Sequence, residues 1–426
     1  MIKNDLYPHV FQPLKVRGVT LKNRLEYSPT VVLKCTPEGE VTQEMLDYVA
    51  WQAEIGVGYV TIGNTPVVHS DSSAWTCELN VTSDRCIHGM ELLSRTAREH
   101  GAELSIELAH AGRGSSHDPK VPALAPSDVP LGDGPLGYIK PMNREDMDYI
   151  RDRFVDCAVR CRNAGLRIIM IHCAHNNLLA QFLSPASNHR TDEYGGSLEN
   201  RMRFPLESIA AIKANIGDQI PLLIKFTPTH FLPNDRSLEE GLVMAKMLVD
   251  AGVDAIHVDI GSWDNLNNVV PSVYDVPGLA IEVAEKLKSA VNVPMLCSGK
   301  LSSDLNQTEQ WLEEGKLDYI IVGRQLLADP FLPTKVMEGQ VVTITGTGLD
   351  RVTSVVFPGQ VAVNNITKVA GGYITITAPA GIAAGGGAIT VEADGERAER
   401  RPARWFGVLP VTVRRNAYGR QLGSFK

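Results

Sequence analysis

The sequence predicts an α/β protein made of a (β/α)8 barrel of the TIM type and a small antiparallel β-sandwich. Between Leu25 and Val322, eight short apolar runs alternate with longer amphipathic stretches, and the composition changes abruptly after Glu338. Strict alternation of strands and helices favours a parallel sheet, and eight such units favour a closed barrel over an open doubly wound sheet. No G-x-G-x-x-G motif follows any of these runs, which weakens the alternative of a dinucleotide-binding fold.

The barrel strands are predicted from the short apolar runs, and the helices from the amphipathic stretches between them. Residues 43–56, before the second strand, and 197–217, before the fifth, show the helical pattern. The strands are expected at residues 25–30, 58–64, 102–108, 167–172, 221–226, 254–259, 293–298 and 317–322.

The last quarter of the chain differs in composition from the rest. Charge nearly disappears after residue 338, and Val, Thr and Ile alternate in short runs between glycine-rich turns at 346–348 and 385–387. This pattern is typical of a small β-sandwich, which we place at residues 339–395, after a barrel domain at 1–338. Residues 396–426 hold seven arginines and one lysine against two glutamates, a net charge of +6, and are expected to form a basic tail.

The overall composition indicates a globular protein. The 426 residues are 44% hydrophobic and 21% charged, with a net charge of −8, which excludes a disordered or collagen-like chain. No apolar run reaches the ~18 residues of a membrane-spanning helix, and the first residues lack the apolar core of a signal peptide. We therefore expect a cytoplasmic protein without a membrane partner. The seven scattered cysteines argue against a disulfide framework.

In a barrel of this type, functional residues stand on the loops that follow the strands. Two glycine-bearing turns, Ser298-Gly299-Lys300 and Gly323-Arg324, follow the seventh and eighth strands. Backbone N–H groups near glycine and the guanidinium of Arg324 suit a phosphate group. The alternative is that these glycines only close tight turns.

A histidine pair follows the fourth strand. His172 and His175 are three residues apart, a spacing that can direct two imidazoles at one oxygen on which negative charge develops. A metal site is the rival interpretation, but no third ligand is evident, so we expect no metal. Histidines with a purely structural role in the loop are the remaining alternative.

Four segments resemble the Old Yellow Enzyme family of flavin-dependent NADH:flavin oxidoreductases, in the branch of 2,4-dienoyl-CoA reductase and enoate reductase. The resemblance extends over residues 8–338, and its most specific block is SPASNHRTDEYGGS within LSPASNHRTDEYGGSLENRMRF. The segments are FQPLKVRGVTLKNRLEYSPT (11–30), ELAHAGR (107–113), LSPASNHRTDEYGGSLENRMRF (183–204) and VGRQLLADP (322–330).

The resemblance implies FMN as the cofactor and NADH or NADPH as the reductant. It implies that the histidine pair holds the activating carbonyl of a small-molecule substrate. The family uses a glutamine at the position of Glu107 and an arginine at that of Lys225, on the pyrimidine side of the flavin. The implied flavin-binding residues are Pro29, Thr30, Asn64, Glu107, Lys225, Ser298, Gly299, Gly323 and Arg324.

The chain also departs from the family pattern. Asn177 stands where members place a tyrosine that protonates the substrate, and an amide cannot serve as a general acid. Cys173 and Asn176 replace glycines, and Met170 replaces a glutamate. Glu107 would place negative charge beside a ring that becomes anionic on reduction, unless Lys225 compensates or Glu107 stays protonated.

The C-terminal quarter departs from the longer members of that branch. No cysteine follows Cys297, so we expect no iron–sulfur cluster of the kind those members carry. Residues 340–394 instead resemble an IPT/TIG immunoglobulin-like domain, in VVTITGTGLDRVTSVVF and YITITAPAG. This domain is expected to act as a spacer or to contact a protein or carbohydrate, and an artificial fusion stays open.

Aromatic residues accompany the basic residues at the C-terminus, but no nucleic-acid motif does, so we expect no nucleic-acid partner. These aromatic residues are Trp405, Phe406, Tyr418 and Phe425.

The sequence therefore predicts an FMN-dependent oxidoreductase that passes a hydride from NADH or NADPH through the flavin to a carbonyl-conjugated alkene. His172 and His175 would stabilise the developing oxygen charge. The alternative is a degenerate flavin-binding barrel with lost or altered activity that serves as a binding or scaffold protein.

Overall fold

The structure is a computed structural model of the chain. It describes residues 7–68, 75–115, 121–130, 139–272, 274–301, 305–328, 330 and 332–333, and then the strands between Val341 and Ser424. Two compact units are distinguished, one of residues 12–301 and 310–323 and one of residues 1–11, 302–309 and 324–426. Each is described by itself.

Eight parallel strands close into a barrel in the order β10-β11-β12-β3-β4-β5-β8-β9, which confirms the predicted fold class. Each predicted strand is present, with ends shifted by one or two residues. The barrel strands are β3 (Leu25–Val31), β4 (Tyr59–Pro66), β5 (Glu103–Ala109), β8 (Ile168–Cys173), β9 (Leu222–Phe226), β10 (Ala255–Val258), β11 (Met295–Cys297) and β12 (Tyr319–Val322).

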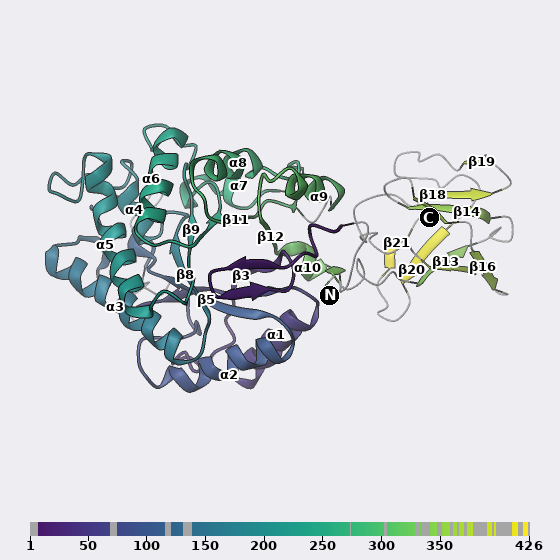
Figure 1. The fold of residues 1–426 in the computed structure, drawn as a ribbon, viewed down its shortest axis with the longest axis horizontal. Helices are drawn as coiled ribbons and strands as arrows, with labels where there is room; N and C mark the ends of the chain where they lie inside the picture. The colour runs from purple at the N-terminus through teal and green to yellow at the C-terminus, as the bar shows by residue number, and fades with distance from the viewer. Residues whose placement is uncertain are drawn as a thin grey trace. The chain divides into compact units, whose positions relative to one another are not determined.

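Helices surround the barrel strands on the outside (Figure 1). Thr42, Asn143, Ser197 and Ser237 begin four of them, each accepting a hydrogen bond from the backbone N–H three residues on, as N-cap side chains do. The helices are α1 (Gln43–Glu54), α2 (Cys86–Glu99), α3 (Arg144–Asn163), α4 (Leu178–Leu183), α5 (Leu198–Ile216), α6 (Leu238–Asp250), α7 (Leu266–Val269), α8 (Ile281–Ala290), α9 (Leu305–Glu313) and α10 (Arg324–Ala328).

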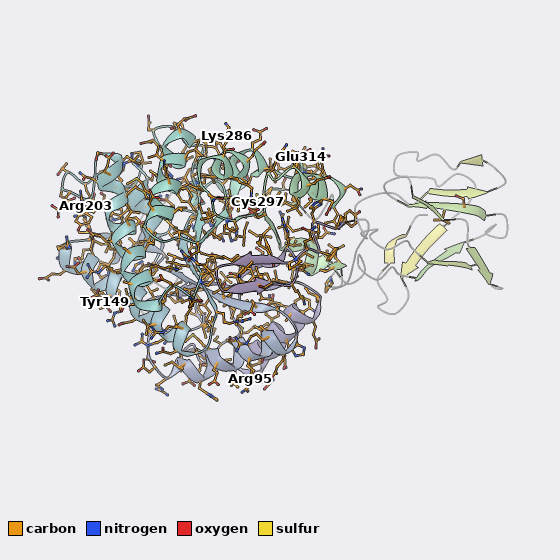
Figure 2. All side chains as sticks on the ribbon, viewed as in Figure 1. Arg95, Tyr149, Arg203, Lys286, Cys297 and Glu314 are labelled. Atoms are coloured by element: carbon orange, nitrogen blue, oxygen red, sulfur yellow. The ribbon has the colours of Figure 1, made fainter. Side chains whose placement is uncertain are left out.

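Charged and polar side chains cover the outer helices. Figure 2 shows Arg95, Arg203 and Lys286 on these helices, whereas Cys297 lies among the strands. No helix in the described part of the chain is long and apolar enough to cross a membrane.

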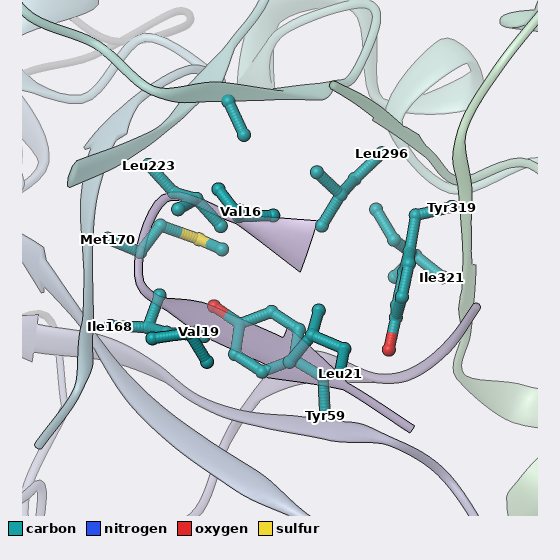
Figure 3. Close-up of a cluster of buried hydrophobic side chains, with 11 residues drawn as sticks. Val16, Val19, Leu21, Tyr59, Ile168, Met170, Leu223, Leu296, Tyr319 and Ile321 are labelled. Carbon is teal, nitrogen blue, oxygen red and sulfur yellow. The ribbon is translucent and has the colours of Figure 1, made fainter. Parts of the chain in front are cut away.

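A hairpin that the sequence analysis did not predict closes one end of the barrel. Strands β1 (Leu14–Val16) and β2 (Val19–Leu21) pair antiparallel, and their buried side chains join an apolar cluster inside the barrel (Figure 3). Asp254 connects the hairpin to the barrel, since it pairs with Arg17 and, at 2.6 Å, with Lys213. We call this cluster the floor; its residues are Val16, Val19, Leu21, Tyr59, Ile168, Met170, Leu223, Ala255, Leu296, Tyr319 and Ile321.

The C-terminal strands form two antiparallel sheets, in the orders β16-β17-β13-β20-β21 and β15-β14-β18-β19, as expected of a sandwich. The strands are β13 (Val341–Gly346), β14 (Val352–Phe357), β15 (Val361–Val363), β16 (Ile366–Val369), β17 (Tyr373–Thr377), β18 (Thr390–Ala393), β19 (Glu396–Arg397), β20 (Val411–Arg415) and β21 (Gln421–Ser424).

The region predicted as a basic tail contributes to these sheets. Strand β20 pairs with β13 along five residues, so this part of the region has a regular place in the fold. The predicted turn residues 347–348 and 385–387 lie outside the described residues, as do Trp405, Phe406, Tyr418 and Phe425.

Candidate active site

A polar layer lies inside the barrel, directly beyond the floor. His172, Lys225 and His257 are paired in register across β8, β9 and β10. Each stands two residues beyond a floor residue of the same strand, and side chains two apart on a strand share a face, so all three point inward. The corresponding floor residues are Met170, Leu223 and Ala255.

Lys225 forms an ion pair with Glu107, the residue that replaces the family glutamine. Lys225 Nζ lies 3.5 Å from Glu107 Oε1, and the backbone N–H of Asn64 donates to Glu107 Oε2 at 3.1 Å. Burial lowers the pKa of Lys225, but the carboxyl groups of Glu107, Asp259 and Glu26 outweigh burial and raise it. Of the two compensations that the sequence analysis left open, the structure contains the ion pair with Lys225.

The ends of β3 and β4 approach closely beside Glu107. A Cβ atom at Gly63 would lie 2.9 Å from the backbone nitrogen of Thr30, so only glycine allows this approach. The register between the strands shifts here, and Asn64 has a left-handed backbone (φ 51°), which directs its N–H toward Glu107. Pro29 and Thr30 therefore lie against Gly63, the residue before Asn64.

His172 is a neutral imidazole, and its contact with the backbone assigns the ring proton to Nε2. The backbone N–H of Ala174 donates to His172 Nδ1 at 3.2 Å, so Nδ1 acts as the acceptor. Burial, followed by the charge of Lys225, lowers the pKa of His172 well below its ordinary value. The amide Nδ2 of Asn177 lies 3.0 Å from both ring nitrogens.

His175 lies beside His172, with 5.3 Å between the ring centroids. His175 and Asn176 both have left-handed backbones (φ 51° and 67°), which explains why asparagine can replace the family glycine at 176. The loop is anchored by Asp264, which accepts from Asn176 Nδ2 at 2.7 Å and pairs with Arg113 at 2.7 Å.

Three buried groups near this layer were missed by the sequence analysis: Asp259, His257 and Glu26. Asp259 directly follows β10, so the rule that polar residues at strand ends carry function could have found it. Its Oδ2 lies 3.1 Å from His175 Nε2. Burial opposes its ionisation, but His175 and then Lys225 outweigh burial and hold the pKa of Asp259 well below its ordinary range.

Glu26 is fully buried inside the barrel. Its Oε1 accepts from Thr61 Oγ1 at 2.7 Å, and Oε2 has no hydrogen-bond partner within the described part of the chain. Burial raises the pKa of Glu26 to about 8, so this carboxyl group is protonated at neutral pH. Burial and the charge of Lys225 also keep the pKa of His257 well below its ordinary value.

The loops that follow the barrel strands carry large exposed apolar side chains. The Trp263 ring lies 6.0 Å from that of His175, so this member of the apolar rim lies beside the histidine pair. The rim residues are Val31, Leu33, Trp75, Phe231, Trp263, Leu266, Val270, Tyr274 and Val276.

The two turns predicted to bind phosphate follow neighbouring strands of the barrel, β11 and β12. Gly299 and Lys300 have left-handed backbones (φ 106° and 62°), and Ser298 precedes them at the end of β11. Gly323 follows β12, and Arg324 begins α10. In the described part of the chain, no group of three or more His, Cys, Asp or Glu residues is arranged to hold a metal ion.

Comparison with known proteins relates both parts of the chain to described families. The model of the NADH:flavin oxidoreductase / NADH oxidase family matches residues 9–342. The model of the IPT/TIG domain, an immunoglobulin-like fold, matches residues 331–401.

Two curated relatives share about a third of their aligned residues with the chain. The NADH oxidase of Thermoanaerobacter brockii is 33% identical over 340 residues, 78% of this chain and 51% of the relative. The chain thus spans about half the length of that relative. The NADPH dehydrogenase of Geobacillus sp. (strain WCH70) is 34% identical over 326 residues, 76% of this chain and 92% of the relative.

Solved structures share the barrel. A complex of 2-naphthoyl-CoA reductase superposes with a TM-score of 0.74 at 24% identity, over 78% of this chain and 52% of that protein. This likeness concerns the fold alone.

Proposed function

Since the chain belongs to the NADH:flavin oxidoreductase / NADH oxidase family, and so to the flavin-dependent oxidoreductases, we propose that it reduces a carbonyl-conjugated alkene with NADH or NADPH, through FMN. The observation that carries the proposal is the pair of imidazoles at the mouth of the barrel, 5.3 Å apart, of which His172 is neutral and keeps an N–H donor. Two donors directed at one oxygen can stabilise the negative charge that develops there during hydride transfer.

The residues around Glu107 fit the polar edge of a flavin ring. Thr30 Oγ1 and Glu107 Oε1 are buried, and neither makes a hydrogen bond within the described residues. A carboxylate can accept a hydrogen bond from a ring N–H, and Lys225 supplies the positive charge and donors that glutamate lacks. When bound, the flavin would supply the hydride.

Other residues would hold the rest of the cofactor. Pro29 and Asn64 would support the ring from the ends of β3 and β4. The phosphate would be held by Ser298, Gly299 and Gly323, in turns of the kind that bind phosphate after the last two strands of such barrels.

The histidine pair would bind and orient the substrate. His172 would donate a hydrogen bond from its Nε2–H to the carbonyl oxygen, and a second hydrogen bond from His175 would fix the alkene in one orientation. The apolar rim supports a substrate with an apolar body, since a small polar molecule would leave Trp263, Phe231 and Tyr274 in water.

The C-terminal part of the chain enters this proposal only as a separate domain. The predicted division places a barrel at 1–338, a sandwich at 339–395 and a basic segment at 396–426, but β20 of the basic segment belongs to the sandwich sheets, so the sandwich extends beyond residue 395. The match to the IPT/TIG domain supports a protein contact by the sandwich, without indicating the partner.

The test separates flavin binding, flavin reduction and substrate reduction. The purified full chain is examined for bound FMN and mixed rapidly with NADPH, and the reduced protein is then mixed with an apolar enone. We expect His172→Ala and His175→Ala to slow reoxidation by the enone about 100-fold or more, the typical effect of losing an oxyanion donor. Reduction by NADPH should change little.

His88→Ala provides the matched control, because His88 is exposed on α2, with 78% of its side chain accessible. If the wild-type protein binds FMN and is reduced by NADPH but reoxidised only by oxygen, the alkene proposal is wrong. That result would favour the alternative of an altered or lost reductase activity.

A further inference from the structure

We propose that Trp263 is a specificity-determining residue of this site, and that it selects substrates whose body beside the carbonyl group is a flat aromatic ring. The inference rests on the proposed reduction of a carbonyl-conjugated alkene, and it names the class of alkene. The preferred substrates are aryl-substituted enones, in which the aromatic ring is conjugated with the alkene.

The Trp263 side chain borders the histidine pair and remains open to solvent. Its ring centroid lies 6.0 Å from that of His175, with 60° between the two ring planes. About half of the residue, 51%, is exposed. A substrate whose carbonyl oxygen accepts a hydrogen bond from His175 therefore has the exposed indole within reach of its body.

The residues on both sides of Trp263 are joined to the loop that carries the histidine. Ser262, directly before Trp263, pairs with His175 in an isolated parallel β-bridge. Asp264, directly after Trp263, accepts from Asn176 Nδ2 at 2.7 Å. These contacts join the loop after β10 to two consecutive residues after β8, so the indole keeps its place beside the imidazole.

Further contacts connect the Trp263 loop to two other loops that follow barrel strands. Asp264 pairs at 2.7 Å with Arg113, from the loop after β5. Asn265 Nδ2 donates to the backbone carbonyl of His230, after β9, at 3.2 Å. Trp263 thus projects from a preorganised loop, and a substrate can pack on its ring with little loss of loop freedom.

The chemistry of this surface favours a neutral aromatic body. An indole ring interacts with another aromatic ring in an offset-stacked or edge-to-face arrangement, which adds to the gain from burying apolar area. A saturated ring of similar size buries apolar area but lacks the π electrons for that interaction. Asp264 and Arg113 neutralise each other beside Trp263, so neither of them favours a charged substrate.

The first experiment compares two enones, 4-phenyl-3-buten-2-one and 4-cyclohexyl-3-buten-2-one, with the full chain, FMN and NADPH. The ratio of their kcat/KM values is measured in the wild type and in Trp263→Leu, so that the intrinsic reactivity of each enone cancels. We expect Trp263→Leu to lose about 2- to 12-fold of the preference for the phenyl compound, which corresponds to one aromatic pair. Trp263→Phe should retain most of that preference.

The second experiment needs no turnover. The saturated ketones 4-phenyl-2-butanone and 4-cyclohexyl-2-butanone, which have no alkene to reduce, are titrated calorimetrically into the full FMN-bound protein without NADPH. The ratio of the two Kd values should shift against the phenyl ketone in Trp263→Leu. An equal ratio in Trp263→Leu and the wild type would overturn the inference, even if the protein reduces both enones.

Tyr149→Leu is the matched control, because Tyr149 is an exposed aromatic residue on the outer helix α3 (Figure 2). Both ratios should stay at their wild-type values in this variant. If Tyr149→Leu changes them as much as Trp263→Leu does, the effect does not arise at the site and the inference is wrong. If the wild type reduces neither enone, the proposed function is wrong, and the Kd ratios still decide whether Trp263 selects an aromatic body.

Discussion

Glu26 is a buried carboxyl group that folding keeps protonated. Because burial raises its pKa from 4.5 to about 8, the folded chain holds a proton that the unfolded chain releases above pH 4.5. The contribution of Glu26 to the free energy of unfolding is therefore fully present below pH 4.5. Above that pH it falls by about 1.4 kcal/mol per pH unit until pH 8.

Glu26→Gln should remove that pH dependence, since glutamine keeps the acceptor for Thr61 and cannot ionise. The difference in free energy of unfolding between the variant and the wild type is measured with urea at pH 5, 6.5 and 8. It should shift in favour of the variant by several kcal/mol as the pH rises. Glu99→Gln, on an exposed helix position, should show no such trend, and parallel pH curves for Glu26→Gln and the wild type would refute the argument.

Lys225 balances the buried charge of Glu107. Lys225→Met would leave that carboxylate with only the Asn64 N–H, and removal of one partner of a buried pair typically costs about 3–5 kcal/mol. Lys225→Arg keeps the charge and should cost much less. Urea denaturation and FMN titration measure both effects; equal stability of the two variants would show that the pair is unimportant.

For single residues, the sequence predicted which residues belong to the candidate site better than it predicted which residues they contact. His172, His175, Glu107 and Lys225 could be identified from motifs and strand ends. The partnership of Asp259 with His175 could not, because 84 residues separate them and only closure of the barrel brings β8 and β10 to the same end.

At the scale of elements, periodicity predicted every barrel strand but not the β1–β2 hairpin. Each hairpin strand has three residues, too few for a two-residue period to stand out. The floor that this hairpin completes depends on contacts with residues from six barrel strands, which no local pattern reports.

Leu21→Ala should therefore destabilise the barrel although the hairpin is short. Leu21 is 2% exposed within the floor, and truncation of a buried leucine typically costs about 2–5 kcal/mol. Thr20→Ala, the neighbouring exposed position on the same strand, should change stability by less than about 0.5 kcal/mol. Urea denaturation compares the two; similar effects would mean that the hairpin does not support the barrel.

At the scale of the whole molecule, the net charge of −8 is the sum of unlike parts. Residues 396–426 carry +6, so the rest of the chain carries −14. The composition change at residue 338 predicted where the C-terminal sheets begin. It did not predict which later residues belong to them, because β20, from the basic segment, pairs with the distant strand β13.

A chain ending at residue 338 should keep its flavin. The Geobacillus NADPH dehydrogenase is covered over 92% of its length by the region that matches the barrel, so a related barrel exists almost without additional sequence. The number of flavin molecules bound per chain should equal that of the full chain. Loss of flavin on truncation would show that the C-terminal part contributes to binding.

Within the described residues, the floor fills one end of the barrel with buried, uncharged side chains. None of its eleven side chains is more than 4% exposed, and none of them is charged. A proton that reaches His257, two residues beyond the floor residue Ala255, is therefore expected to enter from the opposite end of the barrel, as the substrate would. A molecule bound at that end would block proton exchange with the solvent. His257 would then keep the protonation state that it had before binding until the molecule leaves.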